Sequence, residues 1–268
     1  MRFESRKFIL CLIGFARFYI YNSIMKQYLH RLSTFAFFAF ITFSGFSQVT
    51  NDTLSSSAEE IKNAISVKED LTSESLVRNV PFKNIGPTIM SGRVVDVEVN
   101  PENSTDFYVG YATGGVWHTQ NNGITFTSVF DSAPTQNVGD IEIDWKTGTI
   151  WVGTGETISS RSSYAGVGLL KSTDGGKTWE NTGLVDGHHI SDILINPENS
   201  DELVVGVLGH LYSDNAERGI YKTTDGGKTW QKTLFIAPNT GIISLAAAPE
   251  DPEIMYAAAW ERERKAWD

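Results

Sequence analysis

The stretch Ser172-Thr-Asp-Gly-Gly-Lys-Thr-Trp179 returns 51 positions later as Thr223-Thr-Asp-Gly-Gly-Lys-Thr-Trp230. A weaker copy, Thr119-Gln-Asn-Asn-Gly-Ile-Thr-Phe126, lies 53 positions before the first, counted from Asn121 to Asp174. A repeat of about 50 residues is typical of one supersecondary unit that recurs around or along an axis. The repeated stretch therefore indicates the architecture before it indicates any chemistry.

Short alternating runs of apolar residues separated by turn residues fill the space between the copies, as in an all-β fold. Each repeat has room for four short strands, which is the content of one propeller blade. The strands expected to come first in each unit are Val95–Val99, Asp140–Ile143, Ser191–Ile195 and Ile243–Ala247. We therefore predict an all-β fold over residues 81–268, a β-propeller of four-stranded blades that is incomplete after about three and a half blades.

The repeated motif is expected to close a hairpin. Asp-Gly-Gly supplies the positive φ angles of a tight turn, and the Asp carboxylate can accept hydrogen bonds from backbone N–H groups of that turn. The aromatic residue at its end is expected to fill the apolar layer between sheets. Structural roles are accordingly predicted for Asn121, Phe126, Ser172, Asp174, Gly176, Trp179, Thr223, Asp225, Gly227 and Trp230.

The N-terminal 47 residues have the features of a secretory signal region. A basic stretch from Met25 to Arg31 precedes an apolar run and the small-x-small sequence Gly45-Phe-Ser47. Residues 8–21 are also apolar, which leaves open a second membrane segment or a start assigned too early, and Met25 is favoured as the true start. Residues 48–80 are predicted to be a flexible linker with a short helix around residues 57–65.

Charge and cysteine content restrict the class of partner. Loss of residues 1–47 removes six of the 22 basic and one of the 32 acidic side chains, which leaves 16 against 31 and a net charge of −15. Nucleic acid and anionic membranes are poor partners for such a surface. The one cysteine, Cys11, falls in the removed part, so stability must come from packing. We expect a bacterial protein that is exported to the periplasm, the outer surface or the medium.

The motif resembles the Asp-box, or BNR repeat, of sialidases, sortilin-type ectodomains and xyloglucanase-type glycoside hydrolases. The wider chain resembles large exported bacterial proteins described as glycosyl hydrolase or sortilin N-terminal-like. The segments that carry this resemblance are ATGGVW at 112–117, VGTGE at 152–156, GHLY at 209–212, NAERGIYKTTDGGKTW at 215–230 and WERERKAW at 260–267. The resemblance implies a propeller of which this chain is an N-terminal piece, with the boxes far from any active site.

Catalysis has weak support from the sequence. The resemblance to sialidases would require an arginine cluster and a Phe/Tyr-Arg-Ile-Pro signature. That signature is absent from this chain. Glycoside hydrolysis needs two opposed carboxylates. Where xyloglucanase-type hydrolases carry the first of these, this chain has Ala112. Glu156 and Glu261 are the candidates for a displaced equivalent.

Polar residues at the ends of second strands are the remaining candidates for a binding site, because loops at one end of a propeller line its binding face. The ligand-binding candidates are Arg161, His189, His210, Glu217, Arg218, Trp260 and Arg262. His188 and His189 precede an inner strand, from which they could face the central channel, but adjacent histidines rarely bind one ion. Neither a metal nor a cofactor is predicted. Trp117 and Trp151 are expected either to stack on sugar rings or to belong to the core.

Three functions remain open. The favoured one is a non-catalytic binding or scaffold module for a polysaccharide or protein at the bacterial envelope. The alternative is a divergent, xyloglucanase-like hydrolase that cleaves β-glucan internally. The second alternative is a sorting or assembly scaffold of the sortilin type.

Overall fold

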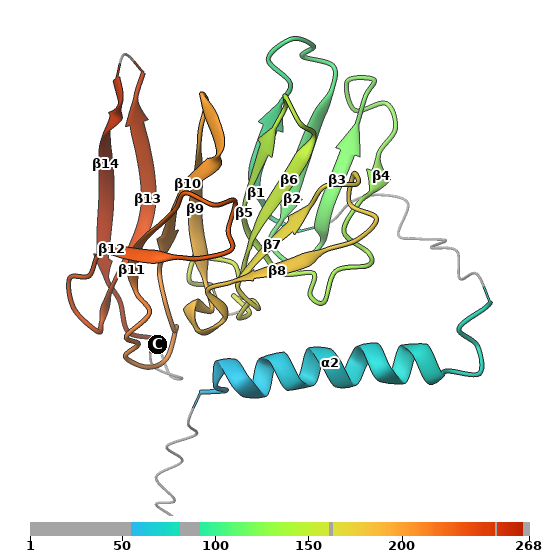
Figure 1. Ribbon diagram of the computed structural model, residues 1–268, viewed down its shortest axis with the longest axis horizontal. Coiled ribbons are helices and arrows are strands. Elements are labelled where there is room, and N and C mark those ends of the chain that lie inside the picture. The colour runs from blue at the N-terminus through green and yellow to red at the C-terminus, as the bar shows by residue number, and fades with distance from the viewer. Residues whose placement is uncertain (1–54, 81–91, 161–162, 250, 265–268) are drawn as a thin grey trace, which may run out of the picture. The chain divides into compact units, whose positions relative to one another are not determined.

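Antiparallel strands make up most of the regular secondary structure of the computed structural model, which describes residues 55–80, 92–160, 163–249 and 251–264 (Figure 1). The first two sheets are built from β1 (Val94–Val99), β2 (Phe107–Tyr111), β3 (Gly115–Thr119), β4 (Thr127–Ser128), β5 (Val138–Asp144), β6 (Thr149–Thr154), β7 (Leu169–Ser172) and β8 (Glu180–Gly183). The remaining strands are β9 (Ile190–Asn196), β10 (Asn199–Val207), β11 (Gly219–Thr223), β12 (Gln231–Leu234), β13 (Thr240–Ala248) and β14 (Asp251–Glu261). The helices are α2 (Ala58–Glu74) and the 3-10 turn η1 (Val185–Gly187).

Each sheet is a simple meander in which every strand pairs with its neighbour in sequence. Strands β1–β4, β5–β8 and β9–β12 form three four-stranded sheets, and β13 pairs with β14. The first strand of each sheet follows the predicted range to within three residues at either end. The described residues therefore form a partial β-propeller, and the predicted fold class is confirmed.

First strands approach the backbone of the neighbouring sheet closely near their beginnings. A Cβ atom on Gly139, in β5, would lie 2.1 Å from the carbonyl oxygen of Ile190, in β9. A Cβ atom on Gly241, in β13, would likewise lie 2.1 Å from the carbonyl oxygen of Leu208. Glycine is needed at both positions because any side chain would force the blades apart.

The apolar core lies between adjacent sheets. One buried cluster joins residues of the first and second sheets, among them Val116, Val138 and Val152. A second cluster joins the second and third sheets and includes Leu169 and Ile193. Burial of these β-branched and leucine side chains is the main favourable term that holds one blade against the next.

Each box aspartate is bonded within its own turn. Asp174 Oδ1 accepts the backbone N–H groups of Lys177 and Thr178 at 3.0 Å, and Oδ2 accepts the Thr178 hydroxyl at 2.6 Å. Asp225 repeats this arrangement. In the weaker copy, Asn121 Oδ1 accepts the N–H of Thr125 at 2.9 Å. These side chains are fully used by the hairpin.

The aromatic residues of the boxes lie at the boundaries between sheets. Trp179 packs edge-on against Phe130, with ring centres 4.8 Å apart. Trp230 packs on the second cluster and donates its indole N–H to the carbonyl of Thr182, in β8, at 2.9 Å. Phe126 differs, because its contact is with Phe107 of its own sheet. Two of the three aromatics therefore act between blades.

Trp151 belongs to the core and offers no surface to a sugar ring. Its side chain is 1% exposed and lies against the box turn of the next blade at Gly227. Lys171 Nζ sits 4.8 Å from the centre of the Trp151 ring and donates to the carbonyl of Gly226 at 3.1 Å. Of the two alternatives that the sequence left open for Trp151, the structure supports the core.

The predicted linker contains a helix longer than expected. Helix α2 has 17 residues, against the nine predicted around residues 57–65. It begins with a capping box: Ser57 accepts the N–H of Glu60, and the Glu60 carboxylate accepts the N–H of Ser57. The predicted signal region, residues 1–47, lies outside the described residues.

Candidate functional site

Five of the predicted residues are buried near strand ends on loops of successive blades, and we call them the loop-end cluster. They are Glu156 after β6, His189 before β9, His210 after β10, Arg218 before β11 and Arg262 after β14. Each is less than 9% exposed. Ionisable side chains are rarely buried to this extent without partners, so their hydrogen bonds decide what the cluster can do.

Glu156 forms an ion pair inside the protein. It is fully buried, and its Oε1 lies 2.9 Å from Nη2 and 3.1 Å from Nε of Arg93. Its Oε2 accepts a short hydrogen bond from the hydroxyl of Ser163. Two nitrogens of Arg93 thus converge on one carboxylate oxygen and Ser163 donates to the other, so each oxygen of Glu156 has a partner. Sequence reasoning missed Arg93. This residue precedes β1 of the first sheet, whereas Glu156 follows β6 of the second sheet, 63 positions later.

Arg218 ties the loops of the third blade to the start of the fourth. Its Nη2 donates to the carbonyls of His210 at 2.7 Å, Ser213 at 3.2 Å and Arg262 at 3.2 Å. Its Nη1 donates to the carbonyl of Asn239 at 3.0 Å. Burial lowers the pKa of Arg218, and the charge of Asp214 offsets part of this effect. Arg218 thus donates hydrogen bonds to four backbone carbonyl groups that lie outside the strand ladders.

Arg262 keeps one edge of its guanidinium group without a partner. Nη1 donates to the carbonyl of Thr157 at 3.3 Å, but Nε and Nη2 have no hydrogen-bond partner among the described residues, although the side chain is only 4% exposed. Burial, and then repulsion from Arg218 and Arg264, lowers the pKa of Arg262 to about 10. Two parallel N–H donors in this geometry suit a pair of oxygen atoms, as in a carboxylate.

His189 is held neutral beside these arginines. Burial, followed by the charges of Arg262 and His188, lowers the pKa of His189 to about 3. Its Nδ1 has no partner among the described residues. His189 and its neighbour His188 contact different groups, because His188 stacks on His210 with ring centres 3.8 Å apart. Neither histidine lines the central channel, in contrast to the position that the sequence suggested.

A second group of residues in the same loops could hold a metal ion. One ligand atom each of Asp186, His188 and His210 lies within 4.8 Å of the others. Sequence reasoning missed this set because it paired His188 with His189, its neighbour in the chain. The partner is His210, which the third blade supplies 22 positions later.

Three of the predicted residues that the structure describes do not join the loop-end cluster. Glu217 binds the hydroxyl of Tyr221 and lies 3.6 Å from Nζ of Lys232, and exposed Glu261 accepts the amide of Asn239 at 2.9 Å. Trp260 is 37% exposed and carries the guanidinium of Arg262 at 4.9 Å from its ring centre. Arg161 lies outside the described residues.

The first strands of the blades line an acidic channel that sequence reasoning also missed. It has a volume of about 440 Å³ and exposes carboxylates of three blades. These are Asp96, Glu98, Asp140, Glu142 and Asp192. Burial, and then repulsion between the acids, raises the pKa of Glu98 to about 7 and that of Glu142 to about 8. Alternation of acidic and apolar residues in β1 and β5 is the sequence signal that marks these side chains.

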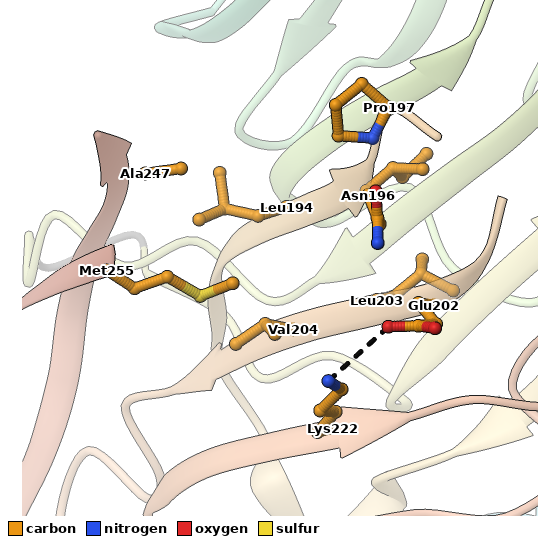
Figure 2. A pocket seen from close by; sticks show the side chains of 10 residues that line it. Leu194, Asn196, Pro197, Glu202, Leu203, Val204, Lys222, Ala247 and Met255 are labelled. Carbon is orange, nitrogen blue, oxygen red and sulfur yellow. Dashed lines mark ion pairs between the residues drawn. The ribbon is translucent and has the colours of Figure 1, made fainter. Parts of the chain in front are cut away.

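A small apolar pocket lies between the third sheet and the strands β13 and β14. Figure 2 shows Leu194, Val204 and Met255 converging on it, with the ion pair of Lys222 and Glu202 (3.4 Å) at one side. Its volume is about 60 Å³, well below the roughly 300–1,000 Å³ of ligand pockets. A sugar ring does not fit, so this pocket is a packing gap between blades.

No family model matches the chain. A probable oligoxyloglucan-reducing end-specific xyloglucanase of Neosartorya fischeri is 29% identical over 92 residues, which are 32% of this chain and 9% of that protein. An ancestral GH74 enzyme superposes with a TM-score of 0.49 at 20% identity, over 65% of this chain and 23% of its own. For the GH74 xyloglucanase from Xanthomonas campestris the TM-score is 0.44 at 15% identity, over 62% and 26%.

The part of the chain that the structure describes contains no helix long and apolar enough to cross a membrane. The chain spans 9% of the curated relative and 23% of the ancestral enzyme, so each likeness concerns only a part of those proteins. Within these limits, the chain is a partial β-propeller that is similar to part of xyloglucanase-type glycoside hydrolases.

Proposed function

We propose that this chain is a non-catalytic propeller module of an exported bacterial protein, and that its loop-end cluster binds a polysaccharide. The observation that carries the proposal is the unpartnered Nε–Nη2 edge of Arg262. A buried donor without a partner costs about 1–3 kcal/mol. Both nitrogens are buried, so a ligand oxygen pair, from a carboxylate or from two vicinal hydroxyl groups, would offset that cost after the loops that cover them have moved.

Trp260 supports a sugar as the ligand. Its ring is partly exposed beside the guanidinium of Arg262, so an aromatic surface and a bidentate donor lie next to each other. Aromatic rings stack on the apolar faces of sugars, while arginine donors fix their oxygen atoms. We expect the ligand to approach Arg262 from the side of Trp260.

The state of the acidic candidates speaks for binding without hydrolysis. Hydrolysis needs one carboxylic acid that donates a proton and an opposed carboxylate. Glu156 is paired with Arg93 and Ser163, and Glu261 is exposed and bonded to Asn239. Ala112 is 1% exposed in the core, at the position where the resemblance would have placed an aspartate.

A hydrolase that acts on β-glucan remains the second candidate, and the similarity to a probable xyloglucanase favours it. Under this alternative, the acid and base would have to include Glu156 or Glu261. Export to the periplasm, the outer surface or the medium is part of the proposal for both candidates. It rests on the basic and apolar composition of residues 25–47.

Affinity electrophoresis of the full chain in gels that contain xyloglucan, mixed-linkage glucan or polygalacturonate tests the proposal. We expect at least one polymer to retard the chain, and Trp260→Ala and Arg262→Lys to weaken retardation while Glu180→Gln, on the exposed strand β8, does not. Release of reducing ends that Glu156→Gln or Glu261→Gln abolishes would support the hydrolase instead. Retardation unchanged in both site variants would remove the loop-end cluster from the proposal.

A further inference from the structure

We propose that Asp186, His188, His210 and Asn215 form a binding site for a divalent transition metal ion, with Zn²⁺ as the expected ion. We call this group the His–Asp site. Asp186 lies in η1, which connects the second and third sheets, and His188 follows it directly. His210 and Asn215 lie in the loop after β10. The inference does not depend on a polysaccharide ligand, because its evidence uses neither Arg262 nor Trp260.

The separation between ligand atoms suits a small cation. His210 Nε2 lies 3.1 Å from the backbone oxygen of Asp186 and 3.4 Å from its Oδ1. Zinc binds imidazole nitrogen and carboxylate oxygen at about 2.0–2.2 Å, which puts neighbouring ligand atoms about 3–3.5 Å apart. These two residues therefore already stand at the spacing that one ion imposes on its ligands.

His188 supplies an imidazole nitrogen that has nothing else to bind. Its side chain is 9% exposed, and Nε2 has no hydrogen-bond partner among the described residues. Its ring stacks on that of His210 at 3.8 Å, with 25° between the planes. Buried polar atoms are nearly always satisfied, so an orphaned imidazole nitrogen on a residue that lies this close to Asp186 and His210 points to a missing partner.

Asn215 gives a second sign of the same kind. Its Nδ2 lies 3.1 Å from His210 Nε2, 3.1 Å from the Asp186 backbone oxygen and 3.2 Å from Asp186 Oδ2. Its Oδ1 is buried and has no partner among the described residues. Rotation of the amide by about 180° would bring Oδ1 to the converging atoms, where it could bind a cation as a carbonyl ligand.

The surroundings hold His210 in position for a metal. Its Nδ1 lies 2.9 Å from the hydroxyl of Ser213, so the ring is oriented from the side opposite to Asp186. Its carbonyl accepts a 2.7 Å hydrogen bond from Arg218. Metal-binding histidines usually have their second ring nitrogen bonded in this way. Two imidazoles, one carboxylate and an amide oxygen form a mixed N/O set that suits Zn²⁺ better than Ca²⁺ or Mg²⁺.

The test uses the full chain without a histidine tag, stripped with EDTA and dialysed, and ZnCl₂ as the probe. Calorimetric titration, together with elemental analysis after dialysis, should give one Zn²⁺ per chain. His188→Ala and His210→Ala should each weaken Zn²⁺ binding by about tenfold or more, since loss of even an outer-shell partner typically costs about 10–100-fold. His118→Asn is the matched control, because His118 lies outside the site and pairs with Asp106 at 2.7 Å.

Asn215→Asp separates a metal site from an ordinary hydrogen-bond network. It adds a carboxylate where the amide stands, so we expect tighter Zn²⁺ binding. Circular dichroism and thermal denaturation establish which variants are folded. A folded chain that retains no stoichiometric Zn²⁺ would overturn the proposal, as would folded His188→Ala and His210→Ala variants with unchanged affinity. If either variant fails to fold, Co²⁺ added to the unaltered chain decides the question, since absence of a ligand-field spectrum would count against the site.

Discussion

Asp140 Oδ2 accepts a 2.8 Å hydrogen bond from the backbone N–H of Ile193, on the first strand of the next blade. Asp192 repeats the contact one blade later and accepts the N–H of Leu245 at 2.7 Å. Both bonds join residues 53 positions apart, close to the period of the box motif. A carboxyl group on each first strand thus fixes the register of the next blade.

Asp140→Ala should destabilise the chain, and Asp140→Asn should not. Alanine leaves the N–H of Ile193 without its acceptor, at a cost of about 1–3 kcal/mol. Asparagine keeps an acceptor and removes a carboxyl group whose pKa is raised, first by burial and then by neighbouring acids. Urea denaturation at pH 8 measures the difference. Equal stability of the two variants would show that the hydrogen bond contributes nothing.

Glu142 predicts a loss of stability as the pH rises. Its pKa in the folded chain is raised to about 8 from 4.5, so the folded state holds its proton more tightly than the unfolded state. Ionisation of Glu142 costs the folded state no free energy below about pH 4.5, where the residue is protonated in both states. The cost grows as the pH rises to about 8 and is constant above that. The free energy of unfolding should therefore fall between pH 5 and pH 8.

Glu142→Gln should reduce this pH dependence, with a gain of about 2 kcal/mol at pH 8 and little change at pH 5. Thermal denaturation at the two pH values provides the measurement. Glu180→Gln, on the exposed strand β8, is the control and should leave the pH dependence as it was. A gain of the same size at both pH values would mean that packing, and not ionisation, limits stability at this position.

The blade order was predictable because it rests on local chemistry. The Asp-Gly-Gly turn closes with bonds between residues at most four positions apart, as between Asp174 and Thr178, and strand alternation is equally local. The start of the helix at 58–74 agrees with the predicted range 57–65, and the helix was underestimated because the prediction ended it nine residues before Glu74. Local patterns therefore predicted most of the sheets and the place of the aromatics between blades.

For the candidate site, the sequence predicted which residues lie in the loops and did not predict which residues contact one another. The loop positions of Glu156 and Arg262 followed from strand ends, but their partners did not. Arg93 is 63 residues from Glu156, and Thr157 is 105 residues from Arg262. Such contacts depend on how blades are placed around the axis. That placement also decides that His188 meets His210 and that carboxylates of three first strands share one channel.

Trp230 should contribute more to stability than Trp179 through its indole N–H. Trp230→Phe loses the hydrogen bond to Thr182, whereas the indole nitrogen of Trp179 has no partner among the described residues. We expect Trp230→Phe to cost about 1 kcal/mol more than Trp179→Phe. Substitution of either by alanine should cost about 3 kcal/mol, since both pack between sheets. Equal effects of the two phenylalanine variants in urea denaturation would contradict the role of the Thr182 carbonyl.

Glu156 should prove to be a structural residue whose loss a second substitution compensates. Glu156→Gln leaves the guanidinium of Arg93 without its carboxylate, and Arg93 is 39% exposed, so the cost should be about 2 kcal/mol and below that of a fully buried pair. In the double variant Arg93→Met with Glu156→Gln, no charge is left unpaired, so part of the stability should return. A double-mutant cycle from urea denaturation gives the coupling between the two residues. A coupling near zero would show that Arg93 does not hold Glu156, and would restore Glu156 as a candidate for proton transfer.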